Sequence, residues 1–255
     1  MICVTGSGQT GVPLSEKSCL MPPDNPGPAS RFAYSLYGLY ALGVFALGVL
    51  ATLVVVALTP GQERRRRAVA RIIRTTFLTA GVRPVVTGLA NLPDGPCIVV
   101  ANHASYVDGL LLKAFLPPRF SFVIKGEMRK NPLVHFVLRR SGARFVERFG
   151  SGTRDIREFV RAAREGAALG FFPEGTFIAD PGVLRFRPGA FLAASKAGIP
   201  VAPIGIRGTR RMLPAGRALP WPSRVQVDVL PAILPDAPEY NDYHGLAEAA
   251  RQRIL

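Results

Sequence analysis

The residues most suited to chemistry lie at positions 102–109, which read NHASYVDG. His103 supplies an imidazole and Asp108 a carboxylate, directly after an apolar run at residues 97–101 that is typical of a strand. Side chains with this spacing do not meet on one regular helix, where neighbours lie three or four residues apart. We therefore expect His103 on the turn after the strand and Asp108 in the first turns of the next helix. The carboxylate would then hold one ring nitrogen and leave the other free as a general base.

A second apolar run also ends in polar residues, in the sequence FFPEGT at positions 171–176. Ligands of open α/β sheets bind beyond the carboxyl ends of the strands, so two such strand ends indicate an active site. The pair of His103 and Asp108 alone is weak evidence, because many chains contain this spacing by chance. The same pair followed by Glu174 and Gly175 is a specific signal. No serine or cysteine nucleophile is required if the base activates a hydroxyl on the substrate.

Short β-rich runs alternate with helical stretches from about residue 84 onward. The sequence predicts strands at 84–88, 98–101, 120–124, 144–147, 168–172, 201–206 and 225–230. It predicts helices at 107–116, 131–140, 153–166, 189–198 and 243–254. Alternation of this kind predicts an α/β fold, with a mixed, largely parallel sheet flanked by helices. We assign residues 84–255 to this domain and add an N-terminal membrane-associated helix.

The segment at residues 32–59 is the candidate membrane helix, since no charged residue occurs between Phe32 and Leu58. At a rise of about 1.5 Å per residue it reaches roughly 40 Å, enough for a hydrocarbon core of about 30 Å. We expect a transmembrane or membrane-embedded helix. Three alternatives are a cleaved signal peptide, a buried core helix, and a hairpin within one leaflet that bends at Gly43 and Gly48.

The flanking segments and the charge also favour a membrane. Residues 1–31 are rich in Pro, Gly and Ser and are predicted to be disordered, and residues 60–83 to form a basic amphipathic helix at the interface. That helix could equally pack on the domain. The run of arginines at 64–67 places the rest of the chain on the cytoplasmic side. A net charge of +15 favours an anionic membrane surface, and we expect no nucleic acid partner. The spacing of cysteines and histidines predicts no disulfide framework and no metal site.

The order of these motifs resembles the glycerolipid acyltransferase family, which includes the 1-acylglycerol-3-phosphate acyltransferases. The resemblance covers roughly residues 84–232 and rests on NHASYVDG, on GARFVER at 142–148, on FPEGT at 172–176 and on IPVAPI at 199–204. It implies transfer of a fatty acyl group from acyl-CoA or acyl carrier protein to a hydroxyl of a lysophospholipid, without a cofactor. It also implies an enzyme on the cytoplasmic side of the cell inner membrane.

The resemblance assigns roles to residues beyond the catalytic pair. Arg148 maps to a phosphate-binding position, and Lys125 lies where many members have a lysine near the acceptor pocket. Glu174 would bind the acceptor's hydroxyls or brace the catalytic loop, and Gly175 would form the tight turn before Thr176.

The sequence alone leaves two questions open. Phe177 stands where many family members carry a phosphate-binding arginine. Either Arg185 or Arg187 supplies that charge, or the acceptor headgroup is not a simple phosphomonoester. Asn102 and Ser105 would orient the loop, help an oxyanion, or serve only as turn residues.

The most specific hypothesis is a membrane-anchored O-acyltransferase that converts lysophosphatidic acid to phosphatidic acid with His103 and Asp108 as the general-base pair. An alternative keeps the chemistry but changes the acceptor, for example to a lyso-ornithine lipid. A different class, a non-catalytic basic lipid-binding protein, would not require both strand-end motifs. A hydrolase is disfavoured because the chain lacks a serine or cysteine nucleophile elbow.

Overall fold

The computed structural model describes residues 28–146, 153–178 and 182–255. The elements before the sheet are α2 (Pro28–Leu58) and α3 (Gln62–Thr79). The strands are β1 (Val85–Thr87), β2 (Ile98–Ala101), β3 (Phe120–Lys125), β4 (Arg144–Val146), β5 (Ala168–Phe171), β6 (Val201–Arg207) and β7 (Gln226–Val229). The helices between and after them are α4 (Asp108–Phe115), α5 (Pro132–Arg140), α6 (Thr153–Arg164), α7 (Gly189–Ala197), α8 (Thr209–Met212) and α9 (Tyr243–Ile254). Short 3₁₀ helices are η1 (Leu89–Asn91), η2 (Gly126–Lys130) and η3 (Pro238–Asn241).

The strands form one seven-stranded sheet in the order β1-β7-β6-β2-β5-β3-β4. Every neighbouring pair is parallel except β6 and β7, so β1 and β7 run opposite to the other five strands. The mixed, largely parallel sheet predicted from the sequence is therefore confirmed. β2 and β5 lie in the middle of the sheet and are buried along their whole length, as expected for parallel strands covered on both faces.

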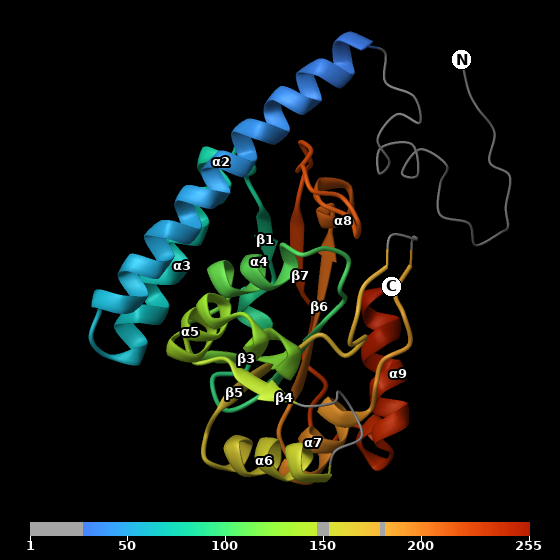
Figure 1. Cartoon of the computed structure of the whole chain (residues 1–255). Coiled ribbons are helices and arrows are strands. Elements are labelled where there is room, and N and C mark those ends of the chain that lie inside the picture. The colour runs from blue at the N-terminus through green and yellow to red at the C-terminus, as the bar shows by residue number, and fades with distance from the viewer. Residues whose placement is uncertain (1–27, 147–152, 179–181) are drawn as a thin grey trace, which may run out of the picture.

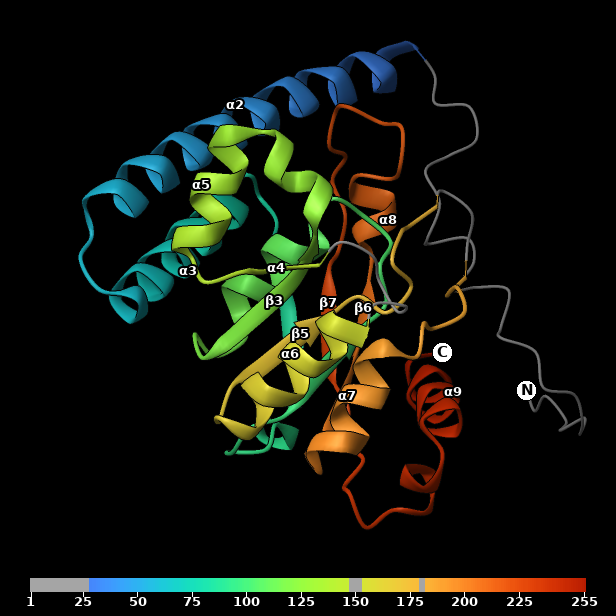
Figure 2. The ribbon, with the colours of Figure 1, turned by 60° about the horizontal axis from the view of Figure 1, so that its bottom comes forward.

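Helices cover both faces of the sheet (Figures 1 and 2). Alternate residues of β2 point to opposite faces: Val99 packs with α3 and α4, whereas Ile98 and Val100 pack with α6, α7 and α9. This double burial explains why the strands read as uninterrupted apolar runs in the sequence. The predicted strand at 201–206 extends one residue further, to Arg207, and the 3₁₀ helices and α8 were not predicted.

α2 is the predicted membrane helix, and it lies against the domain along its length (Figures 1 and 2). The hydroxyls of Tyr37 and Tyr40 donate to the carbonyls of Ala80 and Thr79, at 3.0 and 2.7 Å. Within the described residues, Ser30–Leu58 is the stretch long and apolar enough to cross a membrane, and only 11% of its apolar 18-residue window is buried. That exposure argues against the buried core helix considered from the sequence.

α3 lies between α2 and the domain. Val69, Ile73 and Phe77 are buried against the sheet side of the molecule, so its apolar face packs inward. Two of its arginines also point inward. Arg65 donates to the carbonyl of Arg140, and Arg66 donates to the carbonyl of Ser141 and to backbone and side-chain oxygens around the start of β3. The bonds to Arg140 and Ser141 satisfy carbonyls at the end of α5 that have no partner within that helix.

The ammonium group of Lys113, on α4, lies near Arg66. Its Nζ lies 3.4 Å from the carbonyl oxygen of Ser141. Burial and the nearby charge of Arg66 lower the pKa of Lys113 to about 8. Because desolvation disfavours the charged form, holding this lysine protonated costs stability at neutral pH.

We predict that Lys113→Met raises the free energy of unfolding at pH 7. In the unfolded chain Lys113 titrates near its ordinary value of 10.5, so between pH 8 and that value the unfolded state binds more protons. Wild-type stability relative to the variant should therefore rise as the pH increases through this window. Thermal melts of the two proteins in the same detergent at pH 7 and pH 10 measure the difference. A stability difference between the two proteins that does not change with pH would contradict the lowered pKa of Lys113.

Candidate active site

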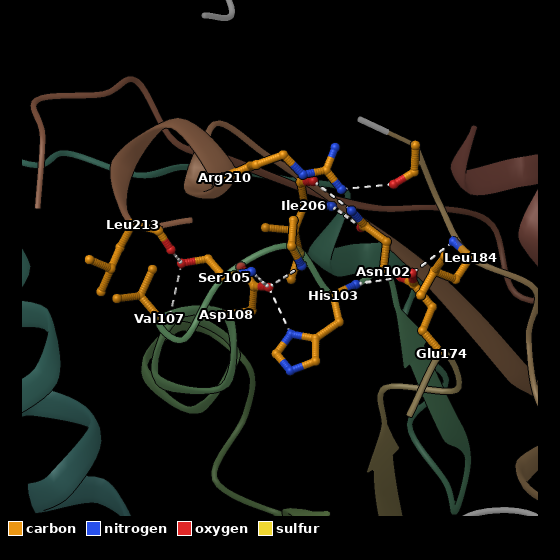
Figure 3. A network of polar contacts seen from close by, with 12 residues as sticks. Asn102, His103, Ser105, Val107, Asp108, Glu174, Leu184, Ile206, Arg210 and Leu213 are labelled. Atoms are coloured by element: carbon orange, nitrogen blue, oxygen red, sulfur yellow. Dashed lines mark hydrogen bonds and ion pairs between the residues drawn. The ribbon is translucent and has the colours of Figure 1, made fainter. Parts of the chain in front are cut away.

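The structure brings the predicted pair together on the loop that follows β2. His103 lies on the turn and Asp108 is the first residue of α4, as the spacing predicted. His103 Nδ1 and Asp108 Oδ2 are 2.9 Å apart. The carboxylate is fully buried, whereas 19% of the imidazole side chain is exposed. Figure 3 shows the other ring nitrogen pointing away from the carboxylate. This edge of the ring is therefore the one a reacting group can approach.

Asp108 also organises the backbone around the histidine. Its Oδ2 accepts hydrogen bonds from the amides of Ala104 and Ser105, at 2.7 and 2.8 Å. Three donors thus converge on one oxygen, while Oδ1 is buried with no hydrogen-bond partner among the described residues. Hydrogen bonds of this kind offset the cost of burying the carboxylate.

Glu174, in the turn after the neighbouring strand β5, braces the same loop. Its Oε1 accepts from the amide of His103 at 2.7 Å, and its Oε2 accepts from the amide of Leu184 at 2.8 Å. Burial raises the pKa of Glu174, and the two backbone hydrogen bonds oppose that shift. Of the two roles considered from the sequence, the geometry matches the brace, since both carboxylate oxygens already have backbone partners.

Asn102 and Ser105 are tied to other parts of the chain. The side-chain amide of Asn102 donates to the carbonyl of Ile206 at 2.9 Å and accepts from the amide of Ile206 at 2.6 Å. Ser105 donates from its hydroxyl to the carbonyl of Leu213 at 2.7 Å. Both side chains hold the loop against β6 and the segment after α8 (Figure 3). The hydroxyl of Ser105 and one N–H of the Asn102 side chain are therefore engaged in orienting the loop.

Aromatic rings enclose the imidazole of His103. Phe172 stacks on one side at a centroid distance of 4.3 Å, and Phe177 lies tilted against it at 4.5 Å. Tyr106 in turn meets the edge of Phe177 at 4.8 Å. The sequence singled out Phe177 only as a departure from the family pattern. Its contact with His103 depends on the fold of the loop after β5, which no local pattern reveals.

The other predicted residues lie at varying distances from this centre. Gly175 has a φ of +71°, and a Cβ there would lie 2.8 Å from Nε of Arg187, so the turn requires glycine and Arg187 lies directly against it. Thr176 is exposed beside this turn. Lys125 ends β3, two strands away from β2 in the sheet. Arg148 lies outside the described residues.

One further arginine, which the sequence analysis did not single out, belongs to this neighbourhood. Arg210 of α8 donates to the carbonyl of Gly182 at 2.8 Å, and its charge acts on Glu174. Arg251 of α9 donates to the carbonyls of Val183 and Leu184. Together with Glu174, these arginines fix the segment that comes after the FPEGT turn.

Comparison with known proteins gives a consistent result. The family model described as Acyltransferase matches residues 83–207, which include both strand-end motifs. A chloroplastic 1-acyl-sn-glycerol-3-phosphate acyltransferase of Brassica napus is 31% identical over 162 residues, covering 60% of this chain and 47% of that protein. The 1-acyl-sn-glycerol-3-phosphate acyltransferase of Pseudomonas aeruginosa is 30% identical over 162 residues, or 62% of each chain. The chain therefore spans less than two thirds of the length of these relatives.

A solved structure is similar over nearly the whole fold. The crystal structure of the 1-acyl-sn-glycerophosphate (LPA) acyltransferase PlsC from Thermotoga maritima superposes with a TM-score of 0.71 at 28% identity. The match covers 88% of this chain and 95% of that one. The similarity thus extends beyond the residues matched by the family model.

We predict that Glu174→Gln removes one of the two hydrogen bonds that Glu174 accepts from the amides of His103 and Leu184. A glutamine side chain has a single oxygen acceptor, so it can retain the amide of His103 or that of Leu184, but not both. Hydrogen–deuterium exchange of the folded protein should show faster exchange at one of these two amides. The amides of Ala104 and Ser105, held by Asp108, serve as internal controls and should stay protected. Unchanged exchange at both Glu174-bound amides would refute the brace.

Proposed function

Because this chain belongs to the acyltransferase family that includes the 1-acyl-sn-glycerol-3-phosphate acyltransferases, we propose that it makes phosphatidic acid from lysophosphatidic acid. The acyl group comes from acyl-CoA or an acyl carrier protein, and the product enters phospholipid synthesis. The observation that carries the proposal is the contact of 2.9 Å between His103 Nδ1 and the buried carboxylate of Asp108. It fixes the imidazole so that its other nitrogen is available as a base.

The proposed reaction is a direct transfer within a complex of enzyme, donor and acceptor. Nε2 of His103 takes the proton of the acceptor hydroxyl while the oxygen attacks the thioester carbonyl carbon. The tetrahedral intermediate then expels the thiolate, which takes the proton from the imidazolium, so the C–S bond breaks as the ester forms. Asp108 stabilises the imidazolium during these steps because its charge lies against Nδ1.

The acceptor's phosphate is proposed to bind on the FPEGT side of the histidine. Arg187 lies against Gly175 at this turn, and a guanidinium offers two parallel donors to a phosphate. Thr176 is exposed beside it. Lys125 and Arg148 are proposed as further contacts to the acceptor on the strength of the family resemblance alone.

Membrane association is proposed through α2, on the cytoplasmic side of the inner membrane. Its exposed face carries large apolar residues along its length, such as Phe32, Leu47 and Leu58. Both halves of the helix are docked on the domain: Tyr34 stacks on Trp221 at 4.7 Å, and Phe45 meets Phe77 at 5.7 Å. A helix held in both halves by the same domain favours a position in the plane of one leaflet over a crossing.

Phe177 favours a second candidate class of acceptor. This ring lies against His103, at the motif position where many family members have a phosphate-binding arginine. An apolar ring beside the base is compatible with an acceptor that lacks a phosphomonoester, such as a lyso-ornithine lipid. An acyl-transfer assay with each of the two acceptors decides the question. If kcat/KM is higher for lyso-ornithine lipid, that lipid becomes the proposed acceptor instead of lysophosphatidic acid.

We predict that purified wild-type protein transfers the acyl group of oleoyl-CoA to lysophosphatidic acid and that His103→Ala does not. Asp108→Asn should lower kcat by roughly 10²–10⁴-fold, the usual contribution of general-base catalysis. The asparagine carbonyl can replace Oδ2, and its NH₂ group can occupy the unpartnered position of Oδ1. The variant should therefore keep the fold, with a modest loss of stability because the buried NH₂ group has no acceptor.

Thermal melts of the wild type and of Asp108→Asn provide the control for folding. Full activity of Asp108→Asn would remove the carboxylate from the mechanism. Equal activity of wild type and His103→Ala would remove the base itself. If the wild type shows no transferase activity with oleoyl-CoA, the same comparison is made with an oleoyl-acyl carrier protein as the donor.

We predict that both ends of α2 lie on the cytoplasmic side. One new cysteine at a time is placed at Arg31 or Pro60, which are exposed at the two ends of the apolar run, in a chain whose Cys3 and Cys19 are changed to serine and whose buried Cys97 is kept. A membrane-impermeant thiol reagent should label both positions in inverted inner-membrane vesicles and neither in intact cells. Labelling of one position from each side would show a spanning helix.

A further inference from the structure

The segment after β3 presents an apolar surface to solvent that the proposed function does not use. It consists of the 3₁₀ helix η2 and the helix α5, and we refer to it as the α5 surface. Its exposed residues include three apolar side chains and three cations: Met128, Leu133, Phe136, Arg129, Lys130 and Arg139.

The apolar side chains of the α5 surface face solvent, which is unusual for a segment surrounded by water. Met128 is 48% exposed, Leu133 is 61% exposed and Phe136 is 38% exposed. Leu133 and Phe136 are three residues apart, so they share one face of the helix. None of the nine residues of α5 is fully buried. A surface helix normally turns polar residues to solvent, so a contiguous apolar face of this kind indicates a binding surface.

The charges around this face select the kind of partner. Arg129, Lys130 and Arg139 border it, and Glu127 is the one carboxylate on η2 and α5. Apolar side chains bordered by cations match the interface of an anionic bilayer, where the rings and chains enter the acyl boundary and the cations meet the headgroups.

The position of the α5 surface links it to both the membrane helix and the site. α5 contacts α2 and lies beside it in Figure 2. η2 begins directly after β3, at the carboxyl edge of the parallel strands where His103 follows β2. β3 is two positions from β2 in the sheet, which corresponds to roughly 10 Å. The segment that carries the exposed apolar face therefore lies next to the proposed anchor and begins at the end of the sheet where the proposed active site lies.

We propose that the α5 surface is a second membrane contact, which binds the interface of an anionic bilayer beside the entrance of the active site. Leu133 and Phe136 enter the boundary between headgroups and acyl chains, and Arg129, Lys130 and Arg139 meet anionic headgroups. This contact holds the carboxyl edge of the sheet against the leaflet, so that a lysolipid reaches His103 without leaving it. The last step rests on the proposed function, whereas membrane contact itself does not.

A tryptophan placed on the α5 surface tests the contact directly. The chain has a single tryptophan, so Leu133→Trp in a Trp221→Phe background carries its only one. With vesicles of phosphatidylcholine and phosphatidylglycerol, we expect a blue shift of its emission. Vesicles with brominated acyl chains should quench it, and pure phosphatidylcholine should produce a smaller effect.

Leu234 offers a matched control. It is 50% exposed, and it follows Ile233, whose amide binds the carbonyl of Val201 at the start of β6. It thus lies at the opposite edge of the sheet from His103. Leu234→Trp in the same background should show no quenching. Equal quenching of the two variants, or none for Leu133→Trp, would overturn the proposal. A blue shift that depends on protein concentration without vesicles would also overturn it, in favour of contact between two copies of the chain.

Kinetics test the second half of the proposal. Leu133→Asp combined with Phe136→Asp should raise the apparent KM for long-chain lysophosphatidic acid in vesicles several-fold, with kcat unchanged. Activity toward a short-chain, water-soluble lysophosphatidic acid should not change, and Leu234→Asp should behave as the wild type. Equal loss with both acceptors would mean a structural defect and refute the delivery role. If the wild type has no transferase activity, the proposed function fails, but the quenching result still decides the membrane contact.

Discussion

Two buried carboxylates, which follow the neighbouring strands β2 and β5 in the chain, hold the loop that carries His103. Burial of a charge is costly unless hydrogen bonds replace water, and here five donors do so: three on Asp108 Oδ2 and one on each oxygen of Glu174. Four of these donors are backbone amides. The arrangement works because β2 and β5 are adjacent and parallel, so their carboxyl ends lie about 5 Å apart. The order of the central strands is thus a condition for the site.

This support leaves the imidazole little freedom. Asp108 holds Nδ1, and Phe172 and Phe177 lie against the ring, so the approach to Nε2 is the open one. A rigid base lowers the cost of reaching a reactive geometry, because less orientational freedom is lost when the substrate binds. The same enclosure places an aromatic ring, and not a cation, beside the base. Under the proposed reaction, recognition of the acceptor headgroup therefore depends on cations further along the loop, of which Arg187 lies against the FPEGT turn.

The sequence was sufficient for the parts of the fold that local patterns determine. All seven strands and the longer helices of the domain were predicted, because buried parallel strands are short apolar runs and the helices have their own periodicity. The turn at His103 and the helix starting at Asp108 followed from the spacing alone. The bond from Glu174 to the amide of Leu184, the ring of Phe177 on His103 and the inward arginines of α3 were not foreseen. These contacts join segments whose approach is set by tertiary packing, for which a single sequence has no local signal.

The packing of α2 also constrains how the protein meets a bilayer. α3 lies against α2 and carries seven charged residues from Glu63 to Arg74. If α2 crossed the membrane in this packing, part of α3 would enter the hydrocarbon, at a cost of about 2.5–3.5 kcal/mol for each charged side chain near the centre. With α2 in the plane of one leaflet, these charges stay in water or against the domain, as Arg65 and Arg66 do. In that orientation α5, which lies beside α2, faces the same leaflet. The in-plane helix and the α5 surface therefore support each other as parts of one membrane-binding side.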